Sequence, residues 1–377
     1  MSGDRAAIAL RGVSKVYPGT AAPAVSDLSF DVDPGHVVAL VGPSGCGKTT
    51  TLKMINRLIE PTAGTIEVLG EDQAAVPAHE LRRRIGYVIQ QVGLFPHRTI
   101  GRNIGVVPEL LGWDKSRIAD RAVELVDLVG LDRDLLDRYP SELSGGQQQR
   151  VGVARALAAD PPILLMDEPY SAVDPIVRER LQDDLLALQA KVHKTIVFVT
   201  HDIDEAIRLA DRVAILDVGG VLAQYDSPDG LLAAPANEFV AAFLGRERGL
   251  RRLALRTVAD IARTDGPSLS VSASASDANA TMERERTSWV AVVDEGRLRG
   301  WVGRRAVASL GATGTLGDLA VERFVARVRP GTPLREALDV IVTSRSRIAA
   351  VVDDDDRFQG MITIDEVAGG LDEWASG

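Results

Sequence analysis

The sequence contains a single cysteine, Cys46, so no intramolecular disulfide can form, which indicates a reducing compartment such as the cytoplasm. No apolar run approaches the roughly 18 residues of a membrane-spanning helix, so any role at a membrane has to be peripheral and exercised through a partner. The opening stretch MSGDRAAIALRG also lacks the apolar core of a signal peptide. Basic residues are not in excess: 43 stand against 53 acidic residues, for a net charge of -10, which gives no electrostatic case for nucleic acid as a partner.

The first two thirds of the chain alternate between strand-like and helix-like patterns. Short, β-branched and almost wholly apolar runs predict strands buried on both faces of a parallel sheet; they lie at 36–41, 163–168, 195–200 and 212–217. Helical periodicity at 176–192 and 202–210 completes the alternation of an α/β fold. Turn-rich strand pairs near 7–19 and 64–72 predict an antiparallel flap, and the helical pattern of 114–140 predicts a helical subdomain, about 92–155, inserted into the sheet domain.

The stretch GPSGCGKT fits the pattern GxxxxGK[ST] between an apolar strand and a helix. Glycines let backbone N–H groups converge on phosphate oxygens, and the start of the helix adds its positive dipole end. We expect Lys48 to reach the β and γ phosphates and Thr49 to bind Mg²⁺; a glycine-rich turn with a stray lysine is the alternative. The residues expected to bind ATP here are Gly42, Pro43, Ser44, Gly45, Cys46, Gly47, Lys48, Thr49 and Thr50. Cys46 has no catalytic role in this interpretation and is expected to be small but reactive.

An acid pair, Asp167 and Glu168, ends the apolar run ILLMDE. Two carboxylates at the end of a buried strand suit two tasks: Asp167 holds Mg²⁺ through water, and Glu168 accepts the proton of an attacking water. Without a phosphate-binding loop nearby, a strand followed by a solvated turn would explain the pair equally well.

The stretch LSGGQQQR at 143–150 precedes a helical pattern and predicts a second helix N-terminus that offers N–H groups to an anion. One ATP does not need two such sites in one chain. We therefore expect Ser144, Gly145, Gly146 and Gln147 to contact the ATP held by another copy, so that ATP joins two subunits into a dimer.

Taken in order, these motifs resemble the nucleotide-binding domain family of ABC transporters over roughly residues 8 to 245. GPSGCGKT is similar to Walker A, ILLMDE to Walker B and LSGGQ to the signature motif, while YVIQQVGLFPH (87–97) resembles the Q-loop, SAVD (171–174) the D-loop and VTHD (199–202) the switch-histidine segment. No membrane span is fused to the chain, and no long insertion separates the loop from the signature, which favours an importer subunit.

The resemblance implies roles for further residues. Gln90 would sense the γ-phosphate and the Mg²⁺ and link them to a membrane subunit, with Gln91 as the alternative for the same role. His201 would contact the γ-phosphate, or else cap a helix. Asp174 is the D-loop acid, and Tyr17 resembles the aromatic residue that stacks on adenine, with a packed core aromatic as the alternative. The metal ligands would be Thr49, Gln90 and Asp167.

The last third of the chain has a different composition. The arginine-rich segment 246–256 and the Ser/Ala segment after it predict a linker region over 246–280, which includes the start of a first repeat. Two copies of a strand-turn-strand pattern, at 287–307 and 346–367, indicate an internal duplication. Five arginines of the segment, Arg246, Arg248, Arg251, Arg252 and Arg256, form either a contact with anionic lipid or a solvated linker helix.

The tail resembles a tandem pair of CBS domains, with a degenerate first repeat at 281–312 and a second repeat at 313–372. Members that bind nucleotide tend to carry Ser/Thr-x-x-Asp after the glycine strand, whereas here Thr363 is followed by Glu366, and Gly303 and Ala306 replace both groups in the first copy. Nucleotide binding and a ligand-free regulatory scaffold therefore both remain open.

An ABC domain followed by a CBS pair resembles the ATP-binding subunits of glycine betaine, carnitine and choline importers. The resemblance implies a P-loop NTPase of α/β class with an antiparallel flap and a helical subdomain, followed by a smaller α+β CBS module. It implies ATP and Mg²⁺, a second copy of the chain, integral permease subunits, an extracytoplasmic substrate-binding protein acting indirectly, and a peripheral place on the cytoplasmic membrane face. The alternatives are another amino acid or amine as cargo, or a regulatory ATPase without a transport role.

Overall fold

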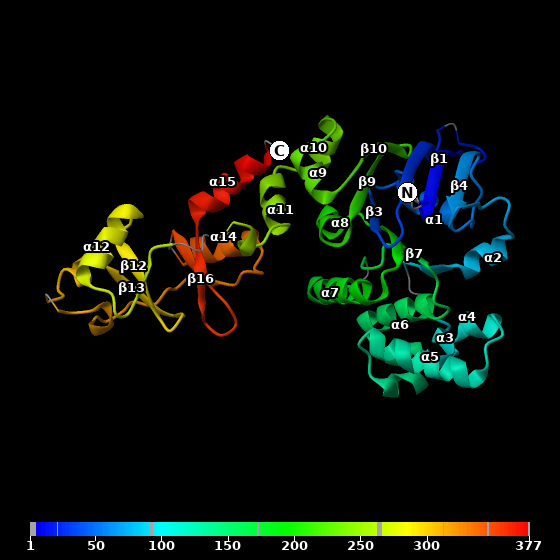
Figure 1. Ribbon diagram of the computed structural model, residues 1–377. Helices are drawn as coiled ribbons and strands as arrows, with labels where there is room; N and C mark the ends of the chain where they lie inside the picture. The colour runs from blue at the N-terminus through cyan, green and yellow to red at the C-terminus, as the bar shows by residue number, and fades with distance from the viewer. Residues whose placement is uncertain are drawn as a thin grey trace. The chain divides into compact units, whose positions relative to one another are not determined.

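The computed structural model describes residues 5–20, 22–90, 93–171, 173–261, 266–311, 313–344 and 347–375. Its contacts divide the chain into two compact units, Met1–Gly245 and Arg246–Gly377 (Figure 1). Among the described residues, no helix is both long enough and apolar enough to cross a membrane. Each unit is described by itself below.

A six-stranded sheet forms the centre of the first unit, with the order β10-β9-β3-β8-β7-β6. Five of its strands are parallel, and β10 pairs with β9 in antiparallel fashion at one edge. The strands are β3 (Val37–Val41), β6 (Ile85–Val88), β7 (Ile163–Asp167), β8 (Thr195–Val199), β9 (Arg212–Asp217) and β10 (Val221–Asp226). Every residue of β3, β7 and β8 is buried, as expected for strands covered on both faces. The four predicted apolar strands are thus confirmed.

Six of the described helices in the first unit lie between strands or follow the last strand, β10. They are α1 (Lys48–Ile55), α2 (Ala78–Arg83), α7 (Pro175–Val192), α8 (Ile203–Leu209), α9 (Pro228–Ala233) and α10 (Glu238–Leu244). Both predicted helices, α7 and α8, are confirmed. Asp174 caps α7 by accepting a hydrogen bond from the Val177 N–H, and Pro175 occupies the first turn, where no N–H is needed.

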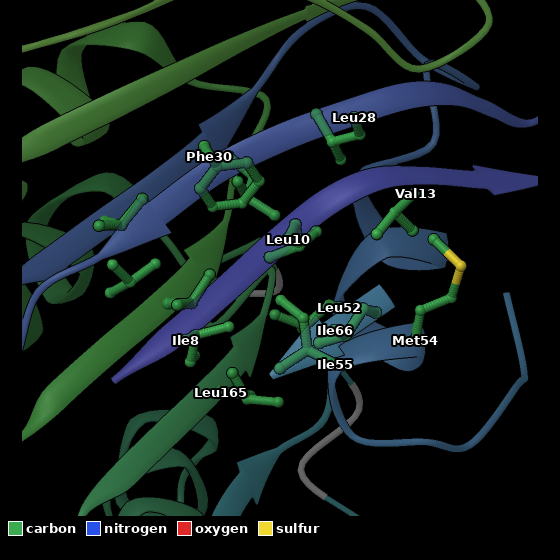
Figure 2. Packing of buried hydrophobic residues seen from close by; sticks show 14 of the residues in the cluster. Ile8, Leu10, Val13, Leu28, Phe30, Leu52, Met54, Ile55, Ile66 and Leu165 are labelled. Carbon is green, nitrogen blue, oxygen red and sulfur yellow. The ribbon is translucent and has the colours of Figure 1, made fainter. Parts of the chain in front are cut away.

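The predicted antiparallel flap is a four-stranded sheet with the order β2-β1-β4-β5. Its strands are β1 (Ile8–Lys15), β2 (Val25–Val32), β4 (Ala63–Val68) and β5 (Glu71–Asp72). Figure 2 shows the side chains of Ile8 and Leu10 packed with Leu52 and Ile55 of α1 and near Leu165 of β7. Because one hydrophobic core includes residues of the flap, α1 and the central sheet, the flap holds the phosphate-binding segment firmly against the sheet.

A helical insertion lies between β6 and β7. It contains α3 (Ile100–Ile104), α4 (Val106–Leu110), α5 (Lys115–Leu128), η1 (Arg133–Asp137), η2 (Pro140–Glu142) and α6 (Gly145–Leu157). Helices α3, α5 and α6 contact one another, and Leu125 and Val126 of α5 are buried. The helical pattern expected at this place is therefore present, and the insertion presents the N-terminus of α6.

The second unit contains two three-stranded sheets with the same design, β11-β12-β13 and β14-β15-β16. In each, a parallel pair is followed by an antiparallel hairpin, and the bulge falls at Val292/Val293 in one and Val351/Val352 in the other. The strands are β11 (Ser268–Ser270), β12 (Trp289–Asp294), β13 (Arg297–Gly303), β14 (Arg327–Val328), β15 (Ile348–Val352) and β16 (Phe358–Thr363). The helices are α11 (Arg248–Ala254), η3 (Val258–Asp260), α12 (Ala275–Arg284), α13 (Arg304–Val307), η4 (Leu316–Asp318), α14 (Leu334–Thr343) and α15 (Ile364–Ala375). The shared register supports the predicted internal duplication.

The prediction of a linker over 246–280 is wrong for most of that range. Helix α11 contacts α14 and α15, and Leu253 and Val258 are buried with Leu334 in one core. In the Ser/Ala segment, β11 joins the first sheet and Ser274 caps α12. Serines that cap helices and alanines that pack inside them have the same composition as a flexible linker, which explains the error.

The five arginines of this segment do not share one exposed face. Arg246 is exposed, but Arg252 is only 6% exposed and the other three are half-buried. A solvated linker helix is therefore wrong for this segment, because α11 is part of the folded second unit.

Candidate functional site

Four segments with predicted site residues follow neighbouring parallel strands of the central sheet. The phosphate-binding loop follows β3, the acid pair ends β7, His201 follows β8, and Gln90 follows β6. Because the carboxyl ends of parallel strands meet at one edge of a sheet, these segments lie side by side. The edge is thus the candidate active site.

The phosphate-binding loop requires glycine at two positions for lack of space. A Cβ atom on Gly42 would overlap the carbonyl oxygen of Leu216, and one on Gly47 would overlap that of Ala24. Gly47 also has a φ of 93°, which side chains rarely allow, and it immediately precedes the first residue of α1. Close packing against neighbouring backbone therefore fixes the path of the loop.

Lys48 is buried and points back into this loop. Its Nζ donates hydrogen bonds to the carbonyl oxygens of Gly42 at 2.7 Å and Pro43 at 2.9 Å, and lies 3.6 Å from the Cys46 Sγ. The ammonium group is therefore held by the loop that would surround a phosphate. Cys46 is fully buried, and burial raises the pKa of its thiol despite the neighbouring Lys48. Both features argue against the expected reactivity of Cys46, because a buried thiol with a raised pKa forms little accessible thiolate.

Thr49 and Asp167 meet across the site. The Thr49 hydroxyl donates to Asp167 Oδ1 at 2.9 Å. Burial raises the pKa of the Asp167 carboxyl, while this hydrogen bond and the ammonium groups of Lys53 and Lys48 oppose the shift. Among the described residues, no three His, Cys, Asp or Glu side chains cluster as ligands for a metal. An oxygen pair of hydroxyl and carboxylate fits Mg²⁺, which usually takes one or two protein carboxylates and completes its shell with water and phosphate.

Glu168 brings together two more of the predicted residues. Gln90 Nε2 donates to Glu168 Oε2 at 2.8 Å, and His201 Nδ1 lies 3.8 Å from the same oxygen. The backbone of Glu168 has a φ of 45°, which is unusual for a residue with a side chain, and its N–H donates to the Val199 carbonyl of β8. Of the two glutamines considered, Gln90 faces the site, whereas Gln91 lies outside the described residues.

Tyr17 lies beside Thr50, which belongs to the first turn of α1. Its hydroxyl is 3.4 Å from the Thr50 hydroxyl, and the Lys15 ammonium lies 5.4 Å from its ring centroid. The side chain is 37% exposed. It is therefore no core aromatic, and its ring is accessible to a ligand beside the loop.

The signature residues begin a helix. Ser144 accepts a hydrogen bond from the Gln147 N–H, and Gln147 Oε1 accepts one from the Ser144 N–H, so that the two form a capping box for α6. A Cβ atom on Gly145 would meet nothing within 4 Å, and one on Gly146 would approach the Val177 side chain. Both hydrogen bonds join residues of the signature to each other. Neither of them connects the signature to the phosphate-binding loop of the same chain. In the D-loop, Asp174 caps α7, and Ala172 lies outside the described residues.

Glu205 is a site neighbour that the sequence reasoning missed. Its Oε2 accepts a hydrogen bond from the Thr200 hydroxyl at 2.8 Å, and Thr200 Oγ1 accepts one from the Asp202 N–H, so Glu205 supports both flanks of His201. Asp202, not His201, caps α8. Burial raises the pKa of Glu205 to about 7. An acid on the otherwise apolar face of a helix four residues after His201 was the available signal.

In the second unit, Thr363 and Glu366 occupy the positions where nucleotide-binding members carry Ser/Thr and Asp. The Thr363 hydroxyl and N–H both donate to Glu366 Oε2, at 2.9 and 2.8 Å, and the Glu366 N–H donates to Thr363 Oγ1. Their polar atoms thus bind each other at the start of α15. In the first copy Gly303 and Ala306 carry no polar side-chain atom.

Two family models match the sequence, the ABC transporter at residues 25–171 and the CBS domain at 258–312 and 316–373. The chain is 48% identical over 349 residues to the osmoprotectant import ATP-binding protein OsmV of Salmonella typhimurium, with 92% of this chain and 90% of the relative covered. It is 45% identical over 359 residues to the choline transport ATP-binding protein OpuBA of Bacillus subtilis, with 94% of each covered.

A similar solved structure is the dimeric post-hydrolysis state of the ATP-binding cassette MJ0796 bound to ADP and Pi. It has a TM-score of 0.53 and 33% identity to this chain, of which it covers 59%, while 98% of the cassette is covered. The likeness thus covers more than half of this chain, and the similar structure is a nucleotide-bound dimer.

Proposed function

Since the chain belongs to the family of ATP-binding subunits of ABC transporters that import quaternary amine osmoprotectants, we propose that its ATPase site is the sheet edge formed by the ends of β3, β6, β7 and β8. The chain is an ATPase that energises uptake of an osmoprotectant such as glycine betaine, carnitine or choline. One observation carries the assignment of the site: the pairs Thr49–Asp167 and Gln90–Glu168 form at that same edge.

The loop of residues 42–49 would hold the phosphates of ATP. Its conformation leaves no room for side chains at Gly42 and Gly47, and Lys48 lies buried within it. Tyr17 would stack on the adenine, which its exposed ring permits. Mg²⁺, when bound, neutralises charge on the phosphates. Thr49 and Asp167 would bind the Mg²⁺, with Gln90 as a further ligand.

Glu168 would act as the general base for the attacking water. Its carboxylate is already oriented by Gln90, and His201 approaches the same oxygen. Both neighbours would position the carboxylate and the γ-phosphate relative to each other, which is the main requirement of phosphoryl transfer. Glu168→Gln keeps the shape of the side chain but removes its basicity, so we expect ATP binding to persist and turnover to fall by roughly 10²–10⁴.

The functional form would be a dimer with ATP between the subunits. The capping box leaves the N-terminal N–H groups of α6 beside Gly145, where a side chain would meet open space. Ser144, Gly145, Gly146 and Gln147 would therefore contact ATP on the second copy, with Asp174 of the D-loop near the same interface. The dimeric cassette with ADP and Pi supports this arrangement.

The remaining partners follow from the transport role. Permease subunits would contact the Gln90 segment, a substrate-binding protein would act through them, and the chain would lie peripherally on the cytoplasmic membrane face. The burial of Arg252 leaves less of the arginine-rich segment for anionic lipid than the sequence suggested. Relatives named as transport proteins over most of their length favour the importer over a regulatory ATPase.

The decisive experiment measures uptake of labelled glycine betaine by the source cells at high and low osmolarity, with wild type and a chromosomal Glu168→Gln variant. We expect the variant to lose the osmotically stimulated uptake while its protein level stays unchanged. Labelled choline and carnitine, tested in parallel, identify the cargo. If uptake of all three persists in a strain with no other importer for them, while the purified chain hydrolyses ATP, the osmoprotectant assignment fails.

A further inference from the structure

A cavity of about 390 Å³ in the second unit is lined by three of its aromatic residues. Trp289 begins β12, Trp301 lies on β13, and Phe324 lies in the second repeat, ahead of β14. Only 4% of the residues in the chain are aromatic, and it has four tryptophans, so two of them in one cavity are a notable concentration. The size is that of a small-molecule site.

The three rings form adjoining walls. The rings of Trp289 and Phe324 meet edge to face, with centroids 5.7 Å apart and planes at 80°. In the hairpin, Trp289 is opposite Gly303 and Ala291 is opposite Trp301, so both tryptophans lie on the same face of the sheet. A Cβ atom on Gly303 would lie 3.5 Å from Trp301 Cζ3, which places this ring over the glycine. Rings at right angles, with a third beside them, present several π-faces to one small volume.

Charged side chains complete the lining. Glu322, Arg323 and Arg347 are exposed residues at this cavity, and the structure gives none of these three side chains a salt bridge with any residue that it describes. The cavity thus offers aromatic faces and a carboxylate, which attract a quaternary ammonium group, and two guanidinium groups, either of which can bind a carboxylate.

The backbone holds this arrangement in place. The Trp301 N–H donates to the Glu322 carbonyl at 2.8 Å, and the Glu322 N–H donates to the Trp301 carbonyl at 2.9 Å. Further along, the Ala350 N–H donates to the Ala326 carbonyl at 3.1 Å. Gly300 permits the close approach, because a Cβ atom there would overlap the Glu322 carbonyl oxygen. The segment that carries Glu322 and Phe324 is therefore fixed at both ends, and the cavity is preformed.

We propose that this cavity binds a small quaternary ammonium zwitterion, the chemical class to which glycine betaine and carnitine belong. The ammonium group lies among Trp289, Trp301 and Phe324 near Glu322, and the carboxylate of the ligand pairs with Arg347. The proposal rests on the function proposed above for the choice of ligand, since it places a binding site for imported cargo on the subunit that powers the import.

The test is equilibrium dialysis of the purified full-length chain with labelled glycine betaine and, separately, with labelled tetramethylammonium, which carries the cation alone. We expect saturable binding of both. Trp301→Leu weakens both about tenfold, because a partly desolvated cation–π contact is worth about that factor. Glu322→Gln also weakens both, whereas Arg347→Gln weakens glycine betaine only. Trp113→Phe, a change in the first unit, leaves binding unaltered and serves as the control.

Since Glu322 and Arg347 are exposed, their variants test the site even if Trp301→Leu fails to fold. Absence of saturable binding by the wild type overturns the proposal, as does binding that survives all three variants. Binding of AMP in place of glycine betaine, lost in Trp301→Leu, assigns the cavity to nucleotides and also overturns it. Dialysis needs no transport, so failure here leaves the uptake result intact, and failure of uptake leaves the binding result intact.

Discussion

Cys46 gives a direct measure of how tightly the phosphate-binding loop is closed. Its side chain is fully buried, and burial raises the pKa of the thiol. At pH 7 we therefore expect a maleimide to label the folded protein much more slowly than the protein unfolded in urea. Because the chain has no other cysteine, the label reports on this position alone. Equal rates in the folded and unfolded protein would show that the loop opens freely.

Glu205 predicts a pH dependence of stability. Its pKa is raised to about 7 from a usual value of 4.5, mainly by burial. The stabilisation from the protonated form is complete below the unfolded value and is lost as the pH rises through about 7. Over that window the wild type loses up to about 3 kcal/mol relative to Glu205→Gln, which cannot ionise.

The measurement is urea unfolding of both proteins at pH 5 and pH 8. Glu179→Gln, which changes an exposed carboxylate on α7, is the matched control and should show no such difference between the two pH values. A stability gap between wild type and Glu205→Gln that is the same at pH 5 and pH 8 contradicts the assignment of a raised pKa.

At the scale of elements, two capping boxes at the starts of α-helices separate a structural role from a functional one. Ser144 caps α6 and Ser274 caps α12, each with a side chain three residues later. Replacing either serine by alanine should cost about 1 kcal/mol of stability. Of the two, only Ser144→Ala should also weaken ATP-dependent dimer formation, because only the N-terminus of α6 is proposed to meet the ATP of a second copy.

Sedimentation in ATP, with Glu168→Gln present in every protein to prevent turnover, measures the dimer. Ser274→Ala should sediment as the parent does, whereas Ser144→Ala should shift toward the monomer. An equal loss of dimer in both variants would show that the effect comes from helix stability alone. A full dimer in Ser144→Ala would show that the serine does not contribute to the interface.

A helix or strand can be predicted from the sequence when its pattern of apolar and polar residues fits only one kind of structure. Strands such as β7 are buried on both faces, and a continuous apolar run has few other meanings in an α/β domain. Strand β2 alternates apolar with polar residues, which is the pattern of a strand with one buried face, but a prediction from wholly apolar runs passes over it. The segment with β11 and α12 was misread because its serines and alanines also suit a linker.

The candidate site divides in the same way. The motif around Lys48 predicts its own conformation, since Gly42 and Gly47 leave no room for a Cβ atom and Gly45 has a φ of 80°. The hydrogen bond between Gln90 and Glu168 joins residues 78 positions apart, and it depends on β6 and β7 being neighbours in the sheet. Likewise, the acid on the apolar face of α8 marks Glu205 as unusual, but its hydrogen bond with Thr200 depends on how α8 packs.

At the scale of the whole molecule, each unit has hydrophobic cores of its own. The main core of the first unit draws its buried residues from Ile8 to Leu216, and the cores of the second unit draw theirs from Leu253 to Val367. A cut after Gly245 removes no residue from the first of these cores and none of the proposed ATPase residues. We therefore expect the chain of residues 1–245 to fold and to hydrolyse ATP.

Calorimetry tests this expectation together with an ATPase assay. The shortened chain should unfold in one transition that matches a transition of the full chain, because a domain with its own hydrophobic core unfolds cooperatively as one unit. Its ATPase activity should remain sensitive to Glu168→Gln, which excludes a contaminant. A shortened chain that aggregates, or that unfolds at a much lower temperature, would mean that the second unit stabilises the first. Retained ATPase activity without glycine betaine binding would assign hydrolysis to the first unit and the proposed cavity to the second.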